Sequence, residues 1–318
     1  MRYRQLGSSG LTVSVVGLGC NNFGRWVDRD GTRAVVQAAL DVGITMFDTA
    51  DTYSRGQSEQ LLGDALAGHR DEVVLATKFG HDMGGANGPD WGARGSRRYV
   101  RRAIEASLRR LGTDHVDLYQ YHAPDRVTPI EETLAALDEL VAEGKVRYLG
   151  SSNFAAWRVV QAEHLARAAG TARFVSAQNN YNLLEREAEA ELTPACLAHG
   201  VGIVPYFPLA NGLLTGKYRR DRPPEPGTRL GDRKPSLHAD APWDVIEGLQ
   251  KYAEERAISL LHVAIGGLAG QPAVASVIAG ATRPEQVRAN AAAGAWELTA
   301  GDLAALDAIV PRGQGVPE

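Results

Sequence analysis

Residues 44–53 read ITMFDTADTY, a short apolar run that ends in Asp48 and is followed closely by Tyr53. Two further apolar runs lead in the same way to Lys78 and His122. If the three runs are neighbouring parallel strands, their carboxyl ends meet at the same face of the sheet. The pattern therefore predicts that these four polar side chains lie together at one mouth.

Short apolar runs alternate with stretches of helical periodicity along most of the chain. The expected strands are Val15–Leu18, Ile44–Asp48, Val73–Lys78, Val116–Tyr121, Val146–Ser151, Phe174–Gln178, Gly202–Tyr206 and Val274–Ile278. Between them, Ile104, Leu108 and Leu111 recur at helical spacing, and a second apolar stripe runs from Ile130 to Val141. Eight parallel strands joined by helices favour a closed (β/α)8 TIM barrel over an open doubly wound sheet.

Two segments fall outside this alternation. Tyr3–Leu6 and Leu11–Val13 flank Gly7-Ser8-Ser9-Gly10, which predicts a β-hairpin that caps the bottom of the barrel. After the seventh strand, residues 219–240 carry almost no apolar periodicity and predict a long loop, either a functional lid or a solvated insertion. We expect residues 1–318 to form a single barrel domain.

Composition points to a small-molecule partner. Hydrophobic residues make up 44% of the chain, and the net charge of −4 gives no electrostatic reason to expect nucleic acid or an anionic membrane. Only Cys20 and Cys196 are present, which argues against a disulfide scaffold and for a reducing, cytoplasmic compartment. The sequence contains neither an apparent signal peptide nor an uninterrupted apolar stretch of about 18 residues.

The four strand-end residues form a plausible proton-donating site. A lysine ammonium close to a phenol favours the phenolate, so Lys78 is expected to lower the pKa of Tyr53. Asp48 would hold the lysine charged, and His122 would orient a substrate oxygen or assist proton transfer. Taken singly, each residue has an ordinary explanation, such as a turn cap, a solvated strand end or a core histidine. Their shared position favours a common function.

Two other kinds of site are disfavoured. Residues 17–22 read GLGCNN, which begins like a dinucleotide fingerprint but has Asn22 where the third glycine belongs, so a Rossmann site is unsupported. The eight histidines form no HExxH motif and no close cluster with cysteine. A metal ion at His122 and Asp48 would be repelled by Lys78, so we expect no metal.

Four segments resemble the signature segments of the aldo-keto reductases. They are FDTADTY at residues 47–53, TKFG at 77–80, GSSNF at 150–154 and QNNYN at 178–182. The resemblance extends from Arg4 through the 280–290 segment and is closest to the bacterial branch that also resembles the potassium-channel β subunits. It implies that Asp48, Tyr53, Lys78 and His122 are the catalytic tetrad, with Tyr53 as general acid for carbonyl reduction.

The resemblance also implies an NADPH site. In its terms, Ser152, Asn153 and Gln178 bind the nicotinamide carboxamide, and Tyr206 stacks on the ring. Further cofactor-binding positions are Gly19, Cys20, Asn21 and Asp48 near the nicotinamide, Phe207, Pro208, Leu209, Ala210, Asn211 and Lys217 around the pyrophosphate, and Gly280, Thr282, Arg283, Gln286 and Asn290 at the adenosine end. Arg283 and the helix start could receive a 2′-phosphate, which favours NADP over NAD.

Two departures bear on that choice. One branch of the family carries a lysine where this chain has Gly280, and an acidic residue often stands at the position of Ala289. Arg283, Lys217 or an arginine between residues 219 and 233 could compensate, and an ordinary surface role for Arg283 stays open.

The expected substrate is a small carbonyl compound in contact with Tyr53, His122, Trp26 and Trp91. Phe23 and the loop from Asp82 to Arg94 could also line the site, with an apolar and a sugar-like carbonyl equally compatible.

Two functional alternatives remain at this level. One is an NADPH-binding regulatory subunit with slow turnover, of the channel β-subunit type. The other is a barrel isomerase or lyase that uses Lys78 as a Schiff base. The sequence also leaves a homo-oligomer open.

Overall fold

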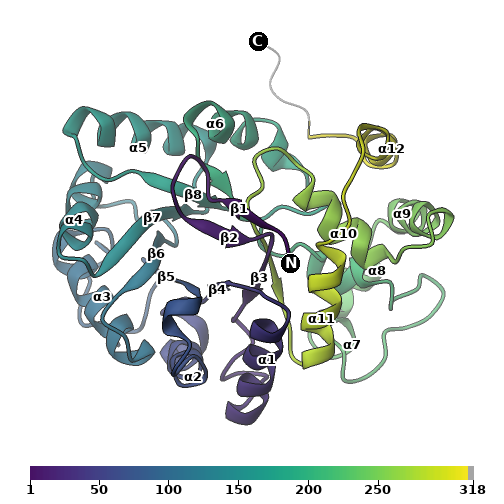
Figure 1. Cartoon of the computed structure of the whole chain (residues 1–318), viewed down its shortest axis with the longest axis horizontal. Helices are drawn as coiled ribbons and strands as arrows, with labels where there is room; N and C mark the ends of the chain where they lie inside the picture. The colour runs from purple at the N-terminus through teal and green to yellow at the C-terminus, as the bar shows by residue number, and fades with distance from the viewer. Residues whose placement is uncertain (314–318) are drawn as a thin grey trace.

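The computed structural model describes residues 1–313, and its centre is a parallel eight-stranded sheet in the order β10-β3-β4-β5-β6-β7-β8-β9 (Figure 1). The strands are β3 Val16–Gly19, β4 Met46–Asp48, β5 Val74–Phe79, β6 Val116–Tyr121, β7 Val146–Ser152, β8 Phe174–Gln178, β9 Gly202–Ile203 and β10 Val277–Gly280. Each lies within or beside one of the predicted apolar runs. The runs are largely apolar because both faces of such strands are covered.

The sheet closes on itself between its first and last strands. Ile203 forms a parallel bridge with Val274. The amide of Ala275 donates to the carbonyl of Ile203 at 2.9 Å, and the amide of Ile278 donates to the carbonyl of Pro205 at 3.0 Å. These contacts confirm the predicted (β/α)8 barrel and exclude an open doubly wound sheet.

Strand β9 is shorter than predicted. The expected strand Gly202–Tyr206 pairs regularly only over Gly202–Ile203, and Tyr206 forms a separate bridge with Asn180. Pro205 interrupts the run, and its nitrogen has no hydrogen to donate to a ladder. The chain nevertheless continues in the strand direction, so Tyr206 still reaches the carboxyl end of the barrel.

Helices surround the strands (Figure 1). They are α1 Arg29–Asp41, α2 Gln57–Ala65, α3 Arg97–Leu111, α4 Ile130–Ala142, α5 Ala156–Ala169, α6 Leu192–His199, α9 Trp243–Glu255, α10 Leu260–Ala269, α11 Pro284–Ala293 and α12 Ala300–Ile309. Short 3₁₀ turns lie at η1 Tyr53–Gly56, η2 Arg70–Glu72, η3 Glu187–Glu189 and η4 Ala210–Thr215. The predicted apolar stripes of α3 and α4 are buried against the barrel.

The predicted N-terminal hairpin is present and caps the barrel. Strands β1 Tyr3–Gln5 and β2 Thr12–Ser14 pair antiparallel. Leu6 and Val13 are fully buried in one cluster with residues of the barrel interior, including Met46. The hairpin therefore closes the amino end of the barrel and leaves the carboxyl ends of the strands as the open mouth (Figure 1).

Residues 219–240, which we call the strap, are more ordered than predicted. They contain two short helices, α7 Arg229–Asp232 and α8 Pro235–Ala239. The Thr228 hydroxyl accepts from the Gly231 amide and caps α7, while Pro235 begins α8. Leu230 is completely buried. The strap is thus anchored at Leu230 while most of its other residues are exposed or half-buried. Helices this short leave too few turns for a visible periodicity.

Candidate active site

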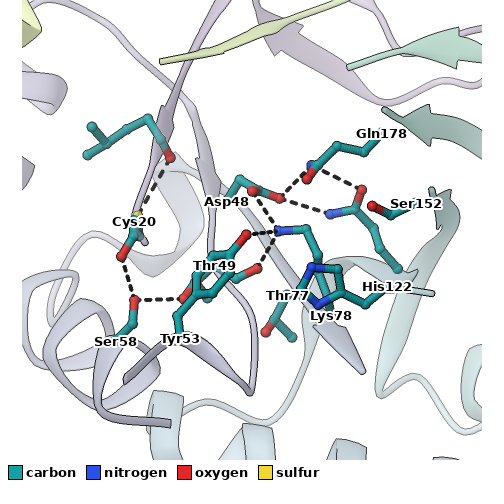
Figure 2. Close-up of polar contacts among 12 residues, drawn as sticks. Cys20, Asp48, Thr49, Tyr53, Ser58, Thr77, Lys78, His122, Ser152 and Gln178 are labelled. Atoms are coloured by element: carbon teal, nitrogen blue, oxygen red, sulfur yellow. Dashed lines mark hydrogen bonds and ion pairs between the residues drawn. The ribbon is translucent and has the colours of Figure 1, made fainter. Parts of the chain in front are cut away.

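Asp48 and Lys78 form a buried ion pair at the ends of adjacent strands β4 and β5. The Lys78 Nζ lies 2.7 Å from Asp48 Oδ2 and donates to the Thr49 carbonyl at 2.8 Å (Figure 2). Both side chains are almost completely excluded from solvent. Burial alone would lower the pKa of Lys78, but attraction to Asp48 and to Tyr53 outweighs it, so the pKa lies above its usual value. Lys78 is therefore held as an ammonium, which makes it a poor Schiff-base nucleophile.

Tyr53 is brought to the same ammonium by the segment that follows β4. The Asp51 amide donates to the Lys78 carbonyl at 3.2 Å, and Tyr53 then begins η1. Lys78 Nζ lies 3.3 Å from the Tyr53 hydroxyl (Figure 2). The predicted lowering of the Tyr53 pKa is wrong for the net effect: burial raises the pKa above 10.0 even though Lys78 acts to lower it. The phenol consequently keeps its proton at neutral pH.

His122 completes the predicted group of four. It follows β6, and its ring meets that of Tyr53 edge-on, with centroids 5.9 Å apart. Burial, and then the charges of Lys78 and His81, lower the pKa of His122 well below its usual value. Its Nδ1 is buried without a hydrogen-bond partner in residues 1–313. The imidazole is thus neutral beside the phenol.

Two glutamines support Asp48 from the neighbouring strands. Gln120 Nε2 donates to Asp48 Oδ1 at 2.9 Å. Gln178 Nε2 donates to the same oxygen at 2.9 Å (Figure 2). The sequence predicted Gln178 as a cofactor-binding residue and did not predict Gln120. A polar amide on β6, two residues before His122 and therefore on the same face of the strand, could have indicated Gln120. With Lys78 on Oδ2, both carboxylate oxygens of Asp48 have donors.

The residues expected at the nicotinamide lie beside these glutamines. Ser152 and Gln178 end β7 and β8, which pair with each other at these two positions. Asn153 adopts a left-handed backbone with φ 58°. Its Nδ2 donates to the Ser152 hydroxyl at 3.2 Å, and its Oδ1 accepts from the Tyr206 hydroxyl at 2.8 Å. Four predicted residues therefore occupy one continuous patch.

The end of β3 contributes the predicted residues Gly19, Cys20 and Asn21. The Cys20 amide donates to the Asp48 carbonyl at 2.9 Å, which places Cys20 directly beside the ion pair. Its side chain is fully buried, and burial raises the pKa of the thiol well above its usual value. Cys20 is therefore a packing residue and a poor nucleophile.

The predicted adenosine end adjoins the same strand. Gly280 ends β10, which pairs with β3 at Gly19. Gln286 Oε1 accepts from both the amide and the hydroxyl of Thr282, at 2.7 and 3.1 Å, and thereby shapes the turn into α11. Arg283 is exposed at the N-terminus of that helix, while Asn290 is buried on it.

The loop predicted for the pyrophosphate runs from Tyr206 through η4. Phe207, Ala210 and Asn211 all have positive φ, so the backbone turns sharply there. Pro208 and Leu209 complete this turn. Lys217 is exposed, and its Nζ lies 4.8 Å from the centre of the Tyr218 ring.

Three aromatic residues were predicted near the substrate, and the structure separates them. Trp26 and Trp91 are exposed, by 44% and 71%, so both remain available to a ligand. Phe23 is fully buried, so the prediction that it lines the substrate site is wrong: its ring packs into the barrel core. The guanidinium of Arg233, in the strap, lies 3.3 Å from the centre of the Trp26 ring.

Within residues 1–313, no group of three or more His, Cys, Asp or Glu side chains is arranged to hold a metal ion. In the same part of the chain, none of the helices has both the length and the apolar character needed to cross a membrane.

Comparison with known proteins identifies the family. The model of the aldo/keto reductase family matches residues 15–311. The chain belongs to this family. It is 36% identical over 297 residues to a versiconal hemiacetal acetate reductase of Aspergillus parasiticus, with 86% of each chain covered. It is 35% identical to an L-glyceraldehyde 3-phosphate reductase of Escherichia coli, with 91% of this chain and 86% of that one covered.

A third relative carries a different name. The chain is 34% identical over 299 residues to a probable voltage-gated potassium channel subunit beta of Arabidopsis thaliana, with 91% of this chain and 90% of that one covered. Family membership and the reductase relatives together support an oxidoreductase that acts on carbonyl groups with a nicotinamide cofactor.

Proposed function

We propose that this aldo/keto reductase reduces an aldehyde or ketone to the alcohol with NADPH, and that Tyr53 gives the proton. Bound NADPH would supply the hydride to the carbonyl carbon. One observation supports Tyr53 as the proton donor. The ammonium of Lys78 lies 2.7 Å from Asp48 Oδ2 and 3.3 Å from the Tyr53 hydroxyl.

The proton donor must be neutral before the reaction and stable as an anion after it. Burial keeps the Tyr53 phenol protonated. When the proton leaves, the negative charge forms beside a buried ammonium that already points at the oxygen, so little reorganisation is needed. Asp48 holds this ammonium in place, and the two glutamines hold Asp48.

His122 suits the role of orienting the carbonyl. A neutral imidazole can donate one hydrogen bond to a carbonyl oxygen without adding a second positive charge beside Lys78. Its ring lies nearly perpendicular to that of Tyr53, at an interplanar angle of 82°. A carbonyl oxygen between the two side chains would accept one hydrogen bond from each. The phenol proton of Tyr53 would then be transferred to this oxygen along its hydrogen bond.

The patch of Ser152, Asn153, Gln178 and Tyr206 fits a nicotinamide. Amides and hydroxyls can satisfy both polar groups of a carboxamide, and the half-buried Tyr206 offers an aromatic face. At the other end, we assign the 2′-phosphate of NADPH to the exposed Arg283 and the first turn of α11. We assign the remaining predicted cofactor residues to the part of NADPH between these two ends.

Replacing Tyr53 with Phe tests the proposal. The variant lacks the transferable proton but keeps the ring, so kcat for carbonyl reduction should fall at least about a hundredfold. NADPH affinity, measured by fluorescence quenching, should stay within about threefold of the parent. Appreciable carbonyl reduction by the variant would exclude Tyr53 as the proton donor.

The similarity to a channel β subunit favours one second candidate function. A cofactor-binding regulatory subunit would bind NADPH tightly, assemble as a ring and turn over slowly. Steady-state kinetics on a carbonyl panel, together with native mass, separates the two candidates. Fast turnover supports the enzyme, whereas turnover slower than about one per minute with a ring-shaped oligomer supports the subunit.

A further inference from the structure

A second imidazole lies at the mouth beside His122. His81 follows β5 by two residues, after Gly80, whose φ of 113° suits glycine alone. A Cβ at Gly80 would lie 2.7 Å from the Tyr121 ring, so the turn depends on the missing side chain. This turn brings the His81 ring to a centroid distance of 4.2 Å from the His122 ring, at an interplanar angle of 66°.

The His81 ring is available to a ligand. The residue is exposed, and within residues 1–313 its ring nitrogens have no hydrogen-bond partner that satisfies ordinary geometry. Its neighbour His122 is the group proposed to bind the carbonyl oxygen. A substituent on the carbon next to that carbonyl would therefore come within reach of His81.

The charges around His81 favour a neutral partner. Although the residue is exposed as a whole, the surrounding protein partly desolvates its ring. This desolvation, and then the charges of Arg94 and Lys78, lower the pKa of His81, so the ring is uncharged at neutral pH. Both cations are already neutralised: Arg94 lies 2.7 Å from Asp90 and 3.3 Å from Asp82, and Lys78 is paired with Asp48. No free positive charge thus faces His81 from these neighbours.

A neutral imidazole has one donor and one acceptor nitrogen, and a hydroxyl group likewise both donates and accepts. A carboxylate or phosphate only accepts and would be served better by a free cation. We propose that His81 binds a hydroxyl group on the carbon adjacent to the substrate carbonyl, so that the enzyme prefers α-hydroxy aldehydes and α-hydroxy ketones. This inference rests on the proposed carbonyl reduction.

Two isosteric substrate pairs test it. Hydroxyacetone differs from 2-butanone, and 2-hydroxypropanal from 2-methylpropanal, only by a hydroxyl in place of a methyl group. With NADPH, the parent protein should show a kcat/KM at least about fivefold higher for the hydroxylated member of each pair, as expected for one hydrogen bond.

Three variants sharpen the readout. His81→Phe keeps a ring against His122 but removes both hydrogen-bonding nitrogens, so the ratio of kcat/KM within each pair should fall to near one. His81→Gln restores a donor and an acceptor and should recover part of the ratio. His69→Phe, at a partly exposed histidine before β5 at the opposite end of the barrel, should leave the ratio unchanged.

The possible outcomes distinguish a failure of the His81 proposal from a failure of the proposed carbonyl reduction. Equal kcat/KM for both members of each pair in the parent would overturn the role of His81 while carbonyl reduction stands. A His81→Phe variant that loses activity equally on both members would also overturn it, because His81 would then only support the ring of His122. Absence of turnover on all four compounds and on a wider carbonyl panel would instead refute the proposed function.

Discussion

The Lys78 ammonium is a single residue on which both stability and chemistry depend. It is completely buried and contacts Asp48, the Thr49 carbonyl and Tyr53. Removing one member of a buried ion pair is costly because the remaining charge has left water without gaining a partner. The same contact that prepares Tyr53 therefore also stabilises the fold.

Replacing Lys78 with Met should lower the free energy of unfolding by about 3–5 kcal/mol and abolish turnover, because Asp48 loses its counterion. The double variant Asp48→Asn with Lys78→Met removes both charges and should regain much of the stability while staying inactive. Urea denaturation beside NADPH oxidation gives both readouts. Stability of Lys78→Met within about 1 kcal/mol of the parent would contradict this account of the pair.

Asp51 makes the protein's stability depend on pH. It is completely buried, accepts from Asn87 Nδ2 at 2.9 Å, and its Oδ1 has no partner within residues 1–313. Burial, and then the nearby Glu59, raise the pKa of Asp51 from 3.8 to about 8. The folded protein thus retains a proton that the unfolded chain releases near pH 4. Stability from this group falls as the pH rises toward 8.

Asp51→Asn cannot ionise, so its free energy of unfolding relative to the parent should improve by about 4 kcal/mol between pH 5 and pH 9. Urea denaturation at pH 5, 7 and 9 measures this difference. Asp71→Asn, on the surface, serves as the control and should show no such trend. An Asp51→Asn effect that is the same at pH 5 and pH 9 would refute the shifted pKa.

Among the elements, the packing of α2 against α3 depends on one glycine. A Cβ at Gly63, inside α2, would lie 2.2 Å from the Leu111 carbonyl oxygen at the end of α3. Helix α2 follows β4 and helix α3 follows β5, and the chain from β4 through β5 supplies Asp48, Tyr53 and Lys78. Their close approach is therefore linked to the geometry of the site.

Gly63→Ala should lower the free energy of unfolding by about 1–3 kcal/mol because the added methyl group overlaps backbone that cannot move away freely. Gly301→Ala, in α12, is the matched control. The nearest atom to its added Cβ would be the Thr299 hydroxyl oxygen at 3.6 Å. The control should be neutral or up to about 1 kcal/mol more stable. Equal stabilities of the two variants in thermal unfolding would disprove the close packing.

Local sequence patterns predicted some secondary-structure elements and not others. Strands such as β6, Val116–Tyr121, were predictable because both of their faces are buried and their apolar runs stand out. The helices α7 and α8 of the strap were not, since elements of four and five residues have no periodicity and depend on caps and on the burial of Leu230.

Across the whole molecule, the barrel explains why the candidate site could be read from the sequence. Parallel strands end at one mouth, so a polar residue after each apolar run predicts a shared location. Asp48, Tyr53, Lys78 and His122 meet there as expected. The support from Gln120 could not be predicted with the same ease, because it depends on which inward-facing position of β6 lies level with Asp48.

The net direction of the Tyr53 pKa shift also could not be predicted from local sequence patterns. The sequence indicated that Lys78 acts on Tyr53, but the net rise in the pKa of Tyr53 depends on how much of the barrel covers it. The contact between His81 and His122 likewise joins the ends of two strands across a glycine turn. Such features require the assembled barrel.

The transfer of deuterium from NADPH tests the central claim most directly. NADPH carrying deuterium at both C4 positions is incubated with the protein and a carbonyl substrate, and the alcohol is analysed by mass spectrometry. We predict one deuterium on the carbinol carbon of the product from the parent protein, and formation of the same labelled alcohol by Tyr53→Phe at least about a hundredfold more slowly. An alcohol without deuterium, or labelled product formed at similar rates by both proteins, would contradict the account.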